Sequence, residues 1–120
     1  MKVAIYARYS TDKQDESTIT CQIRNCEAFA ESQGWQIYKR YSDEGISGSD
    51  DSRPGYQQLL ADSEAFLFDG IIVDETSRLT RAPGELQRLM ERFAFRDQFL
   101  CDSKGFDSRQ ETAGDRKSVV

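Results

Sequence analysis

Apolar and polar positions along the chain follow two spacings, one typical of strands and one typical of helices. Short apolar runs predict strands at residues 2–8, 71–73 and 98–101, and an alternating run predicts a half-exposed or edge strand at 35–41. Between these runs, apolar residues recur at helical spacing over 17–32, 54–63 and from 83 to 93. Gly34 is a natural stop for the first helix, and Pro54 and Pro83 suit the first turns of the other two.

Strands and helices alternate strictly in this prediction, which indicates an α/β layered fold with a mostly parallel sheet. The strand at 2–8 is expected to be central, and the strand at 71–73 fully buried. Ligands of such sheets bind beyond the carboxyl ends of the strands. Polar residues at 8–10, 43–48 and 74–81 follow three of those ends. We therefore expect these segments to converge at one edge of the sheet.

Composition narrows the functional classes. The chain has 120 residues, enough for one domain with a core, and no apolar run approaches the roughly 18–20 residues of a membrane span. It contains no histidine, which excludes Ser-His and Cys-His nucleophile pairs and histidine metal sites within the chain. The net charge is -5, whereas a self-sufficient DNA-binding domain is normally basic. Nucleic acid would thus need a further domain or a locally basic face.

The start of the chain and its cysteines indicate a cytoplasmic protein. Met1-Lys2 leads straight into a strand-like run without a signal-peptide pattern. Three cysteines, Cys21, Cys26 and Cys101, cannot all pair and lack metal-ligand spacing. We expect them to be reduced, buried thiols.

Candidate chemistry begins where the first strand ends. Arg8 and Ser10 are two residues apart, so an extended chain would place the cation and the hydroxyl on one face. Arg78 and Arg81 are three apart, and one helical turn would bring them to the same side. Guanidinium groups bind phosphate oxygens at two points. A serine that attacks a phosphodiester, with Arg53 and the other arginines in place of a metal, is chemically coherent.

Five motifs follow one another along the chain: YARYSTDKQ at 6–14, Glu16-Ser17 with Gln22, DEGISG at 43–48, Arg53-Pro54-Gly55 followed by Leu59-Leu60, and SRLTR at 77–81. In this order they resemble the serine site-specific recombinases, the resolvase/invertase group, and together they cover nearly all of residues 2–102. The second and fourth motifs favour the large integrase or transposon subgroup. The resemblance implies a three-layer α/β/α resolvase-like domain around a central, mostly parallel sheet of four to five strands.

The resemblance also implies a mechanism. Ser10 would attack a DNA phosphodiester and become linked to the 5′ phosphate, and the released 3′ hydroxyl would later reverse the step on a new strand. No metal, ATP or other cofactor is implied. Arg8, Arg53, Arg78 and Arg81 would hold the scissile phosphate. The residues implied to position the loop and the phosphate are Gln14, Gln22 and Ser47.

Partners and domain limits follow from the same resemblance. The implied partners are DNA with a specific recombination site and further copies of the full-length protein, as dimer and tetramer, with no membrane. Residues 1–102 would form the catalytic core. Residues 103–120 would lead to a dimerisation helix and a DNA-binding region missing from this chain. The isolated fragment is expected to be a monomer or weak dimer that cannot complete recombination.

One departure from the family pattern leaves alternatives open. The family usually has an aspartate where this chain has Ser77, so the proton acceptor for Ser10 is unassigned, with Asp74 or Glu75 as possible substitutes. A catalytically inactive DNA-associated subunit is therefore one alternative. Another is a flavodoxin-like module whose Ser10-Thr11 loop cradles a nucleotide phosphate, although such loops mostly use backbone N–H groups rather than four arginines.

Overall fold

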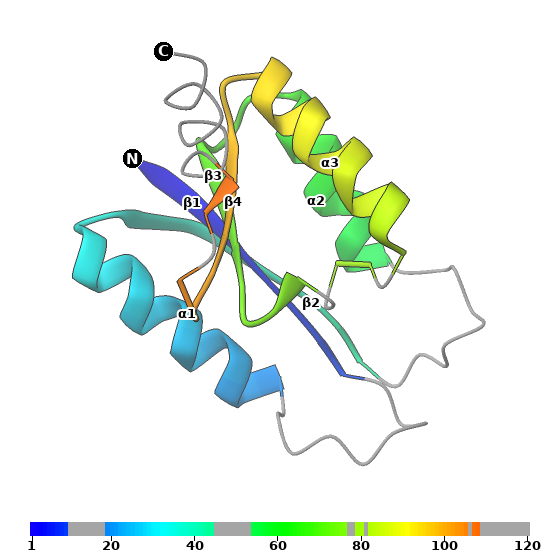
Figure 1. Ribbon diagram of the computed structural model, residues 1–120. Helices are drawn as coiled ribbons and strands as arrows, with labels where there is room; N and C mark the ends of the chain where they lie inside the picture. Colours follow the sequence, from blue (N-terminus) through cyan, green and yellow to red (C-terminus); the bar gives the residue numbers. More distant parts are fainter. Residues whose placement is uncertain (10–18, 45–53, 77–78, 81, 106, 109–120) are drawn as a thin grey trace.

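A computed structural model describes residues 1–9, 19–44, 54–76, 79–80, 82–105 and 107–108. The chain alternates strands and helices, as its apolar pattern predicts (Figure 1). Among the described residues, no helix is long and apolar enough to cross a membrane. The elements are β1 (Lys2–Tyr9), α1 (Ile19–Gln33), β2 (Gln36–Glu44), α2 (Pro54–Glu64), β3 (Gly70–Val73), α3 (Pro83–Phe95) and β4 (Phe99–Asp102).

The four strands form one parallel sheet in the order β2-β1-β3-β4. β1 is therefore an inner strand and β2 an edge strand, and every residue of β3 is buried, which confirms the three expectations from the sequence. On the outer side of β4, Cys101 forms an antiparallel bridge with Asp107, and the Leu100 N–H donates to Ser108 Oγ at 3.0 Å. The chain thus turns back along the outer edge of β4.

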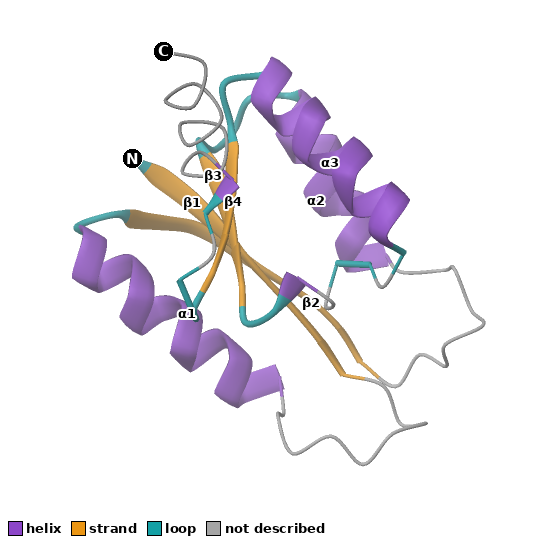
Figure 2. Ribbon diagram, in the orientation of Figure 1, coloured by secondary structure: helices purple, strands orange, loops and turns teal. Residues whose placement is uncertain are grey.

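Helices cover both faces of the sheet, which confirms the three-layer α/β/α architecture (Figure 2). α1 packs on the face formed by the odd-numbered residues of β1, such as Val3 and Ile5. α2 and α3 pack on the face of Ala4 and Tyr6. Side chains alternate along a strand, so each face of β1 supplies its own half of the core.

α1 ends where the sequence predicts. Gly34 has a φ of +76°, and its N–H donates to the Glu31 carbonyl at 3.0 Å. The next N–H, that of Trp35, donates to the Ala30 carbonyl at 3.0 Å. This left-handed glycine satisfies carbonyl groups that the end of the helix would otherwise leave unpaired.

Two expectations from the sequence are wrong. β2 continues to Glu44, three residues beyond the end of the strand predicted at 35–41. The strand persists because its backbone pairs with β1 through Arg8↔Asp43 and Tyr9↔Glu44, and because Asp43 is buried with hydrogen-bond partners. The second error concerns Cys21, which is exposed on α1, whereas Cys26 and Cys101 are buried as expected.

Candidate functional site

The carboxyl ends of all four strands lie at one edge of the sheet, because the strands are parallel. Arg8 of β1 pairs in register with Asp43 of β2, and Asp74 directly follows β3. Arg8 is half-buried and lies on the same side of β1 as Ala4 and Tyr6. That is the face on which α2 and α3 pack.

The Gln22 side chain holds the backbone of Arg8. Gln22 is fully buried on α1; its Nε2 donates to the Arg8 carbonyl at 2.9 Å, and its Oε1 accepts from the Arg8 N–H at 3.0 Å. β1 pairs with β3 only as far as Tyr6↔Val73. The carboxamide of Gln22 thus takes the place of a peptide group beyond the end of β3 and pairs with the β1 backbone at Arg8.

Asp43 fixes the beginning of α2. Its Oδ1 accepts from the Gly55 N–H at 2.8 Å, and its Oδ2 accepts from the Tyr56 N–H at 2.9 Å and from the Tyr6 hydroxyl at 2.7 Å. The first N–H groups of a helix need acceptors, and an arginine side chain such as that of Arg53 has none. Asp43 supplies them from the neighbouring strand while only 4% exposed.

Gly55 allows this close contact between α2 and β2. A Cβ atom at position 55 would lie 2.5 Å from the Ser42 carbonyl oxygen and 3.1 Å from Asp43 Oδ1. The first of these distances is shorter than van der Waals contact, and its partner is backbone that cannot rotate away. The Arg53-Pro54-Gly55 motif therefore has a local structural reason for its glycine.

The possible substitutes for the missing aspartate have partners of their own. Asp74 is buried, and its Oδ1 accepts hydrogen bonds from Asn25 Nδ2 and from Ser103 Oγ, both at 3.1 Å. Glu75 forms an exposed ion pair with Lys104, and this hydrogen bond raises the pKa of Lys104 above its ordinary value. Neither arrangement assigns the proton acceptor for Ser10.

Of the candidate site residues, Arg8 and Gln22 are described, and they are in contact through the Arg8 backbone. The expected cluster of one serine and four arginines therefore stays a prediction. Ser77 also falls outside the described residues. The other candidates outside them are Ser10, Gln14, Ser47, Arg53, Arg78 and Arg81.

Sequence reasoning missed the role of Asp43, although its position opens the DEGISG motif. The motif itself was a usable signal, because Asp43 follows the strand predicted at 35–41 by two positions, at the edge of the sheet where the candidate segments were expected to converge. Tyr6, which donates to Asp43, was likewise read only as part of the opening motif. Asp43 accepts from the N–H groups of Gly55 and Tyr56, which lie twelve and thirteen positions later in the chain. Neither the helical nor the strand period relates residues that far apart.

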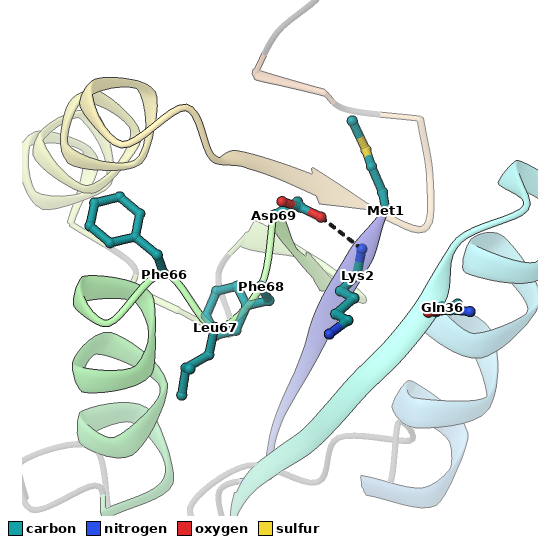
Figure 3. A pocket seen from close by; sticks show the side chains of 7 residues that line it. All are labelled: Met1, Lys2, Gln36, Phe66, Leu67, Phe68 and Asp69. Atoms are coloured by element: carbon teal, nitrogen blue, oxygen red, sulfur yellow. Dashed lines mark hydrogen bonds between the residues drawn. The ribbon is translucent and has the colours of Figure 1, made fainter.

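A pocket of about 430 Å³ lies at the opposite edge, where β1 and β2 begin (Figure 3). There the Lys2 N–H donates to Asp69 Oδ2 at 2.9 Å. The pocket is thus separate from Arg8 and the candidate site. Its lining residues are Met1, Lys2, Gln36, Phe66, Leu67, Phe68 and Asp69.

Comparison with known proteins agrees with this geometry. A family model described as "Resolvase, N terminal domain" matches residues 3–116. The chain is also 42% identical over 60 residues to an uncharacterized immunity region protein 3 of Bacillus phage phi105, an alignment that covers 48% of this chain and 73% of the phage protein.

Solved structures resemble the chain over nearly its whole length. The N-terminal catalytic domain of TP901-1 integrase is 32% identical with a TM-score of 0.78, covering 91% of this chain and 82% of that one. The C-terminal catalytic domain of ISC1926 TnpA, an IS607-like serine recombinase, is 25% identical with a TM-score of 0.74, and the match covers 99% of this chain and 80% of that one. A resolvase family site-specific recombinase from Streptococcus pneumoniae shares the fold, with a TM-score of 0.76 and 20% identity. The match covers 99% of this chain and 90% of that one.

Proposed function

The chain belongs to the resolvase N-terminal domain family, as a serine recombinase catalytic domain, and on that premise we propose that it cuts and rejoins DNA through Ser10. The observation that carries this proposal is the family match over residues 3–116, which spans all five sequence motifs. Membership in this family also favours recombination over the flavodoxin-like alternative.

The proposed reaction exchanges one phosphate ester for another. Ser10 Oγ loses its proton to an acceptor that is still unassigned and attacks the phosphorus of a DNA phosphodiester. The bond from phosphorus to the 3′ oxygen breaks, and this oxygen leaves as a hydroxyl. The 5′ phosphate stays esterified to Ser10. Attack by the 3′ hydroxyl of a new strand reverses the step, and because the number of phosphate esters is unchanged, no ATP is consumed.

Arginines would stabilise the charge on the phosphate oxygens in the transition state. We assign this role to Arg8, Arg53, Arg78 and Arg81. The placement of Arg8 supports it, since Arg8 lies on the face where α2 and α3 pack. In the sequence, α2 begins directly after Arg53 and α3 begins two residues after Arg81.

The remaining candidates would order the site. Gln22 would keep Arg8 in place through its two hydrogen bonds to the Arg8 backbone. Gln14 and Ser47 would position the loop and the phosphate. The proposed partners are DNA and, in the full-length protein, further copies that form dimers and tetramers. The net charge of -5 supports a role for other regions in holding the DNA.

Covalent capture of DNA tests the proposal. The protein, in its natural length, would be incubated with nicked duplex DNA of randomised sequence. Cleavage close to a nick releases a short 3′-hydroxyl strand that diffuses away, so rejoining is blocked and the adduct accumulates. We expect an adduct that survives detergent, with the phosphate mapped to Ser10 by mass spectrometry. Ser10→Ala should lower its formation by about 10³-fold or more and leave the thermal unfolding temperature unchanged.

Ser32→Ala is the matched control. Ser32 lies on the last turn of α1, where its hydroxyl donates to the Phe29 carbonyl at 2.7 Å, far along the chain from Ser10. This variant should form the adduct at the wild-type rate. An adduct formed by Ser10→Ala, or mapped to another residue, would contradict the nucleophile. DNA binding by the wild-type protein without any adduct would favour the inactive-subunit alternative.

A further inference from the structure

Asp74 is a buried carboxylate that joins three segments of the chain. It lies 4% exposed at the carboxyl end of β3. Its Oδ1 accepts from Asn25 Nδ2 of α1 and from the Ser103 hydroxyl beyond β4, each at 3.1 Å. The Ser103 hydroxyl also lies 3.3 Å from the Asp74 carbonyl oxygen, and the Ser103 N–H donates to the Val73 carbonyl at 3.0 Å.

α1 carries a second polar contact one turn earlier. Gln22, which holds the Arg8 backbone, and Asn25, which binds Asp74, are three residues apart and lie on neighbouring positions of the helix surface. One helix therefore connects the end of β1 with the end of β3. We call the four side chains that make these connections the polar latch: Gln22, Asn25, Asp74 and Ser103.

The chain that leaves β3 is also anchored on its far side. Leu79 is fully buried in the core between the sheet and α2 and α3, and its N–H donates to the Thr76 carbonyl at 3.0 Å. Asp74 and Leu79 thus hold the chain that leaves β3 at two points. Asn25 is exposed and Ser103 is half-buried, so loss of the Asp74 acceptor would release both side chains from the end of β3.

We propose that Asp74 is a positioning residue for DNA cleavage. Through Asn25 and Ser103 it holds the end of β3 against α1, and α1 in turn holds Arg8 through Gln22. The polar latch thereby fixes the end of β1, which carries Arg8, relative to the end of β3. This inference rests on the proposed function. It gives Asp74 a structural role through Oδ1, the oxygen that accepts from Asn25 and Ser103, and this role requires no proton transfer from Ser10.

Two substitutions separate these roles. Asp74→Asn keeps an oxygen that can accept from Asn25 and Ser103 but removes the negative charge. Asp74→Ala removes the acceptor altogether. Adduct formation would be measured in single turnovers on the nicked DNA pool, at a temperature where circular dichroism finds both variants folded. We expect Asp74→Asn to react near the wild-type rate and Asp74→Ala about 10²-fold more slowly, with DNA affinity unchanged.

A double variant and the pH profile complete the test. Asn25→Ala should slow the reaction, and adding it to Asp74→Ala should slow it little further, because both remove the same contact. The pH dependence of the rate should be the same in wild type and Asp74→Asn.

If Asp74→Asn is as slow as Asp74→Ala, the charge acts directly and the inference is wrong. A wild-type rate for Asp74→Ala would also overturn it, whereas a wild-type protein without a Ser10 adduct would remove the proposed function itself.

Discussion

At the scale of the residue, Asp43 connects the end of one strand to the start of one helix. Its carboxylate accepts three hydrogen bonds, from the Tyr6 hydroxyl and from two N–H groups of α2, and it is nearly inaccessible to water. Buried carboxylates are stable in proteins when hydrogen bonds replace their hydration. The start of α2 therefore depends on a residue of the neighbouring strand, twelve positions before Gly55.

Two residues that the motifs predict for the site lie among the described residues, and their roles in a site stay predictions. Arg8 and Gln22 were selected from the recombinase-like motifs, and the structure places them in contact. The role of Asp43 was not predicted, because a carboxylate that caps a helix from another strand leaves no periodic signal. Ordinary helix caps are local and can be recognised from the residues next to the helix.

We predict that Gly55→Ala displaces the start of α2. The added Cβ atom would lie 2.5 Å from the Ser42 carbonyl oxygen, so the first turn must move away from β2 and weaken its bonds to Asp43. We expect a loss of about 1–3 kcal/mol in the free energy of unfolding, measured with urea, and slower formation of the Ser10 adduct.

Gly84→Ala provides the control for that change. Gly84 also lies in the first turn of a helix, but a Cβ atom there would meet only Arg88 Nη1, at 3.8 Å. Alanine in an unstrained helical position should leave stability unchanged or raise it slightly. Equal unfolding free energies for the two alanine variants would show that α2 tolerates the added methyl group.

At the scale of the element, apolar periodicity predicted the type of each named helix and strand from β1 to β4, and the errors lie at their ends. β2 is longer than predicted because Asp43, a polar residue, is buried by its hydrogen bonds rather than by apolar contacts. Tyr41 and Asp62 show the same effect between β2 and α2, where the tyrosine hydroxyl donates to the carboxylate at 2.5 Å. Binary patterns treat such buried polar pairs as exposed surface and therefore end the strand too early.

We predict that Gln22→Glu loosens the junction of α1 and β1. The carboxylate can still accept from the Arg8 N–H, but it has no N–H to donate to the Arg8 carbonyl, so two oxygen atoms would face each other. The free energy of unfolding should fall by about 1–3 kcal/mol. Amide hydrogen exchange at Arg8 should become faster.

The matched substitution on an exposed glutamine is Gln57→Glu. Gln57 lies near the start of α2, where a negative charge is neutral or mildly favourable. It should leave both the stability and the exchange rate at Arg8 unchanged. Unchanged exchange in Gln22→Glu as well would mean that the Gln22 contact does not hold the end of β1.

At the scale of the whole molecule, the parallel sheet explains why distant motifs gather at one edge. Chain order and strand direction were enough to predict that residues near Arg8, Asp43 and Asp74 share that edge. They were not enough to predict the contacts among side chains there, which depend on rotamers and on partners from α1 and α2. The arginine cluster depends on the same kind of detail, and it stays a prediction.

The buried thiol of Cys26 makes the stability of the whole domain sensitive to alkaline pH. Burial, and then the negative charges of Asp74, Asp102 and Glu27, raise its pKa from the ordinary value of 9.0 to about 12. Above pH 9 the thiol of the unfolded chain loses its proton, whereas the folded chain keeps it. The unfolded state then binds fewer protons, so the stabilisation present below pH 9 is lost as the pH rises toward 12.

We therefore predict that the free energy of unfolding falls between pH 9 and pH 11 by up to about 1.4 kcal/mol per pH unit from this group. Urea titrations at several pH values measure this slope.

Cys26→Ala should lower the stability at pH 8, since it removes a buried side chain, but it should make the slope shallower. Cys21→Ala, at an exposed position on α1, should leave the slope unchanged. If wild type and Cys26→Ala lose stability in parallel above pH 9, the burial of the Cys26 thiol between α1 and the sheet does not control the alkaline response.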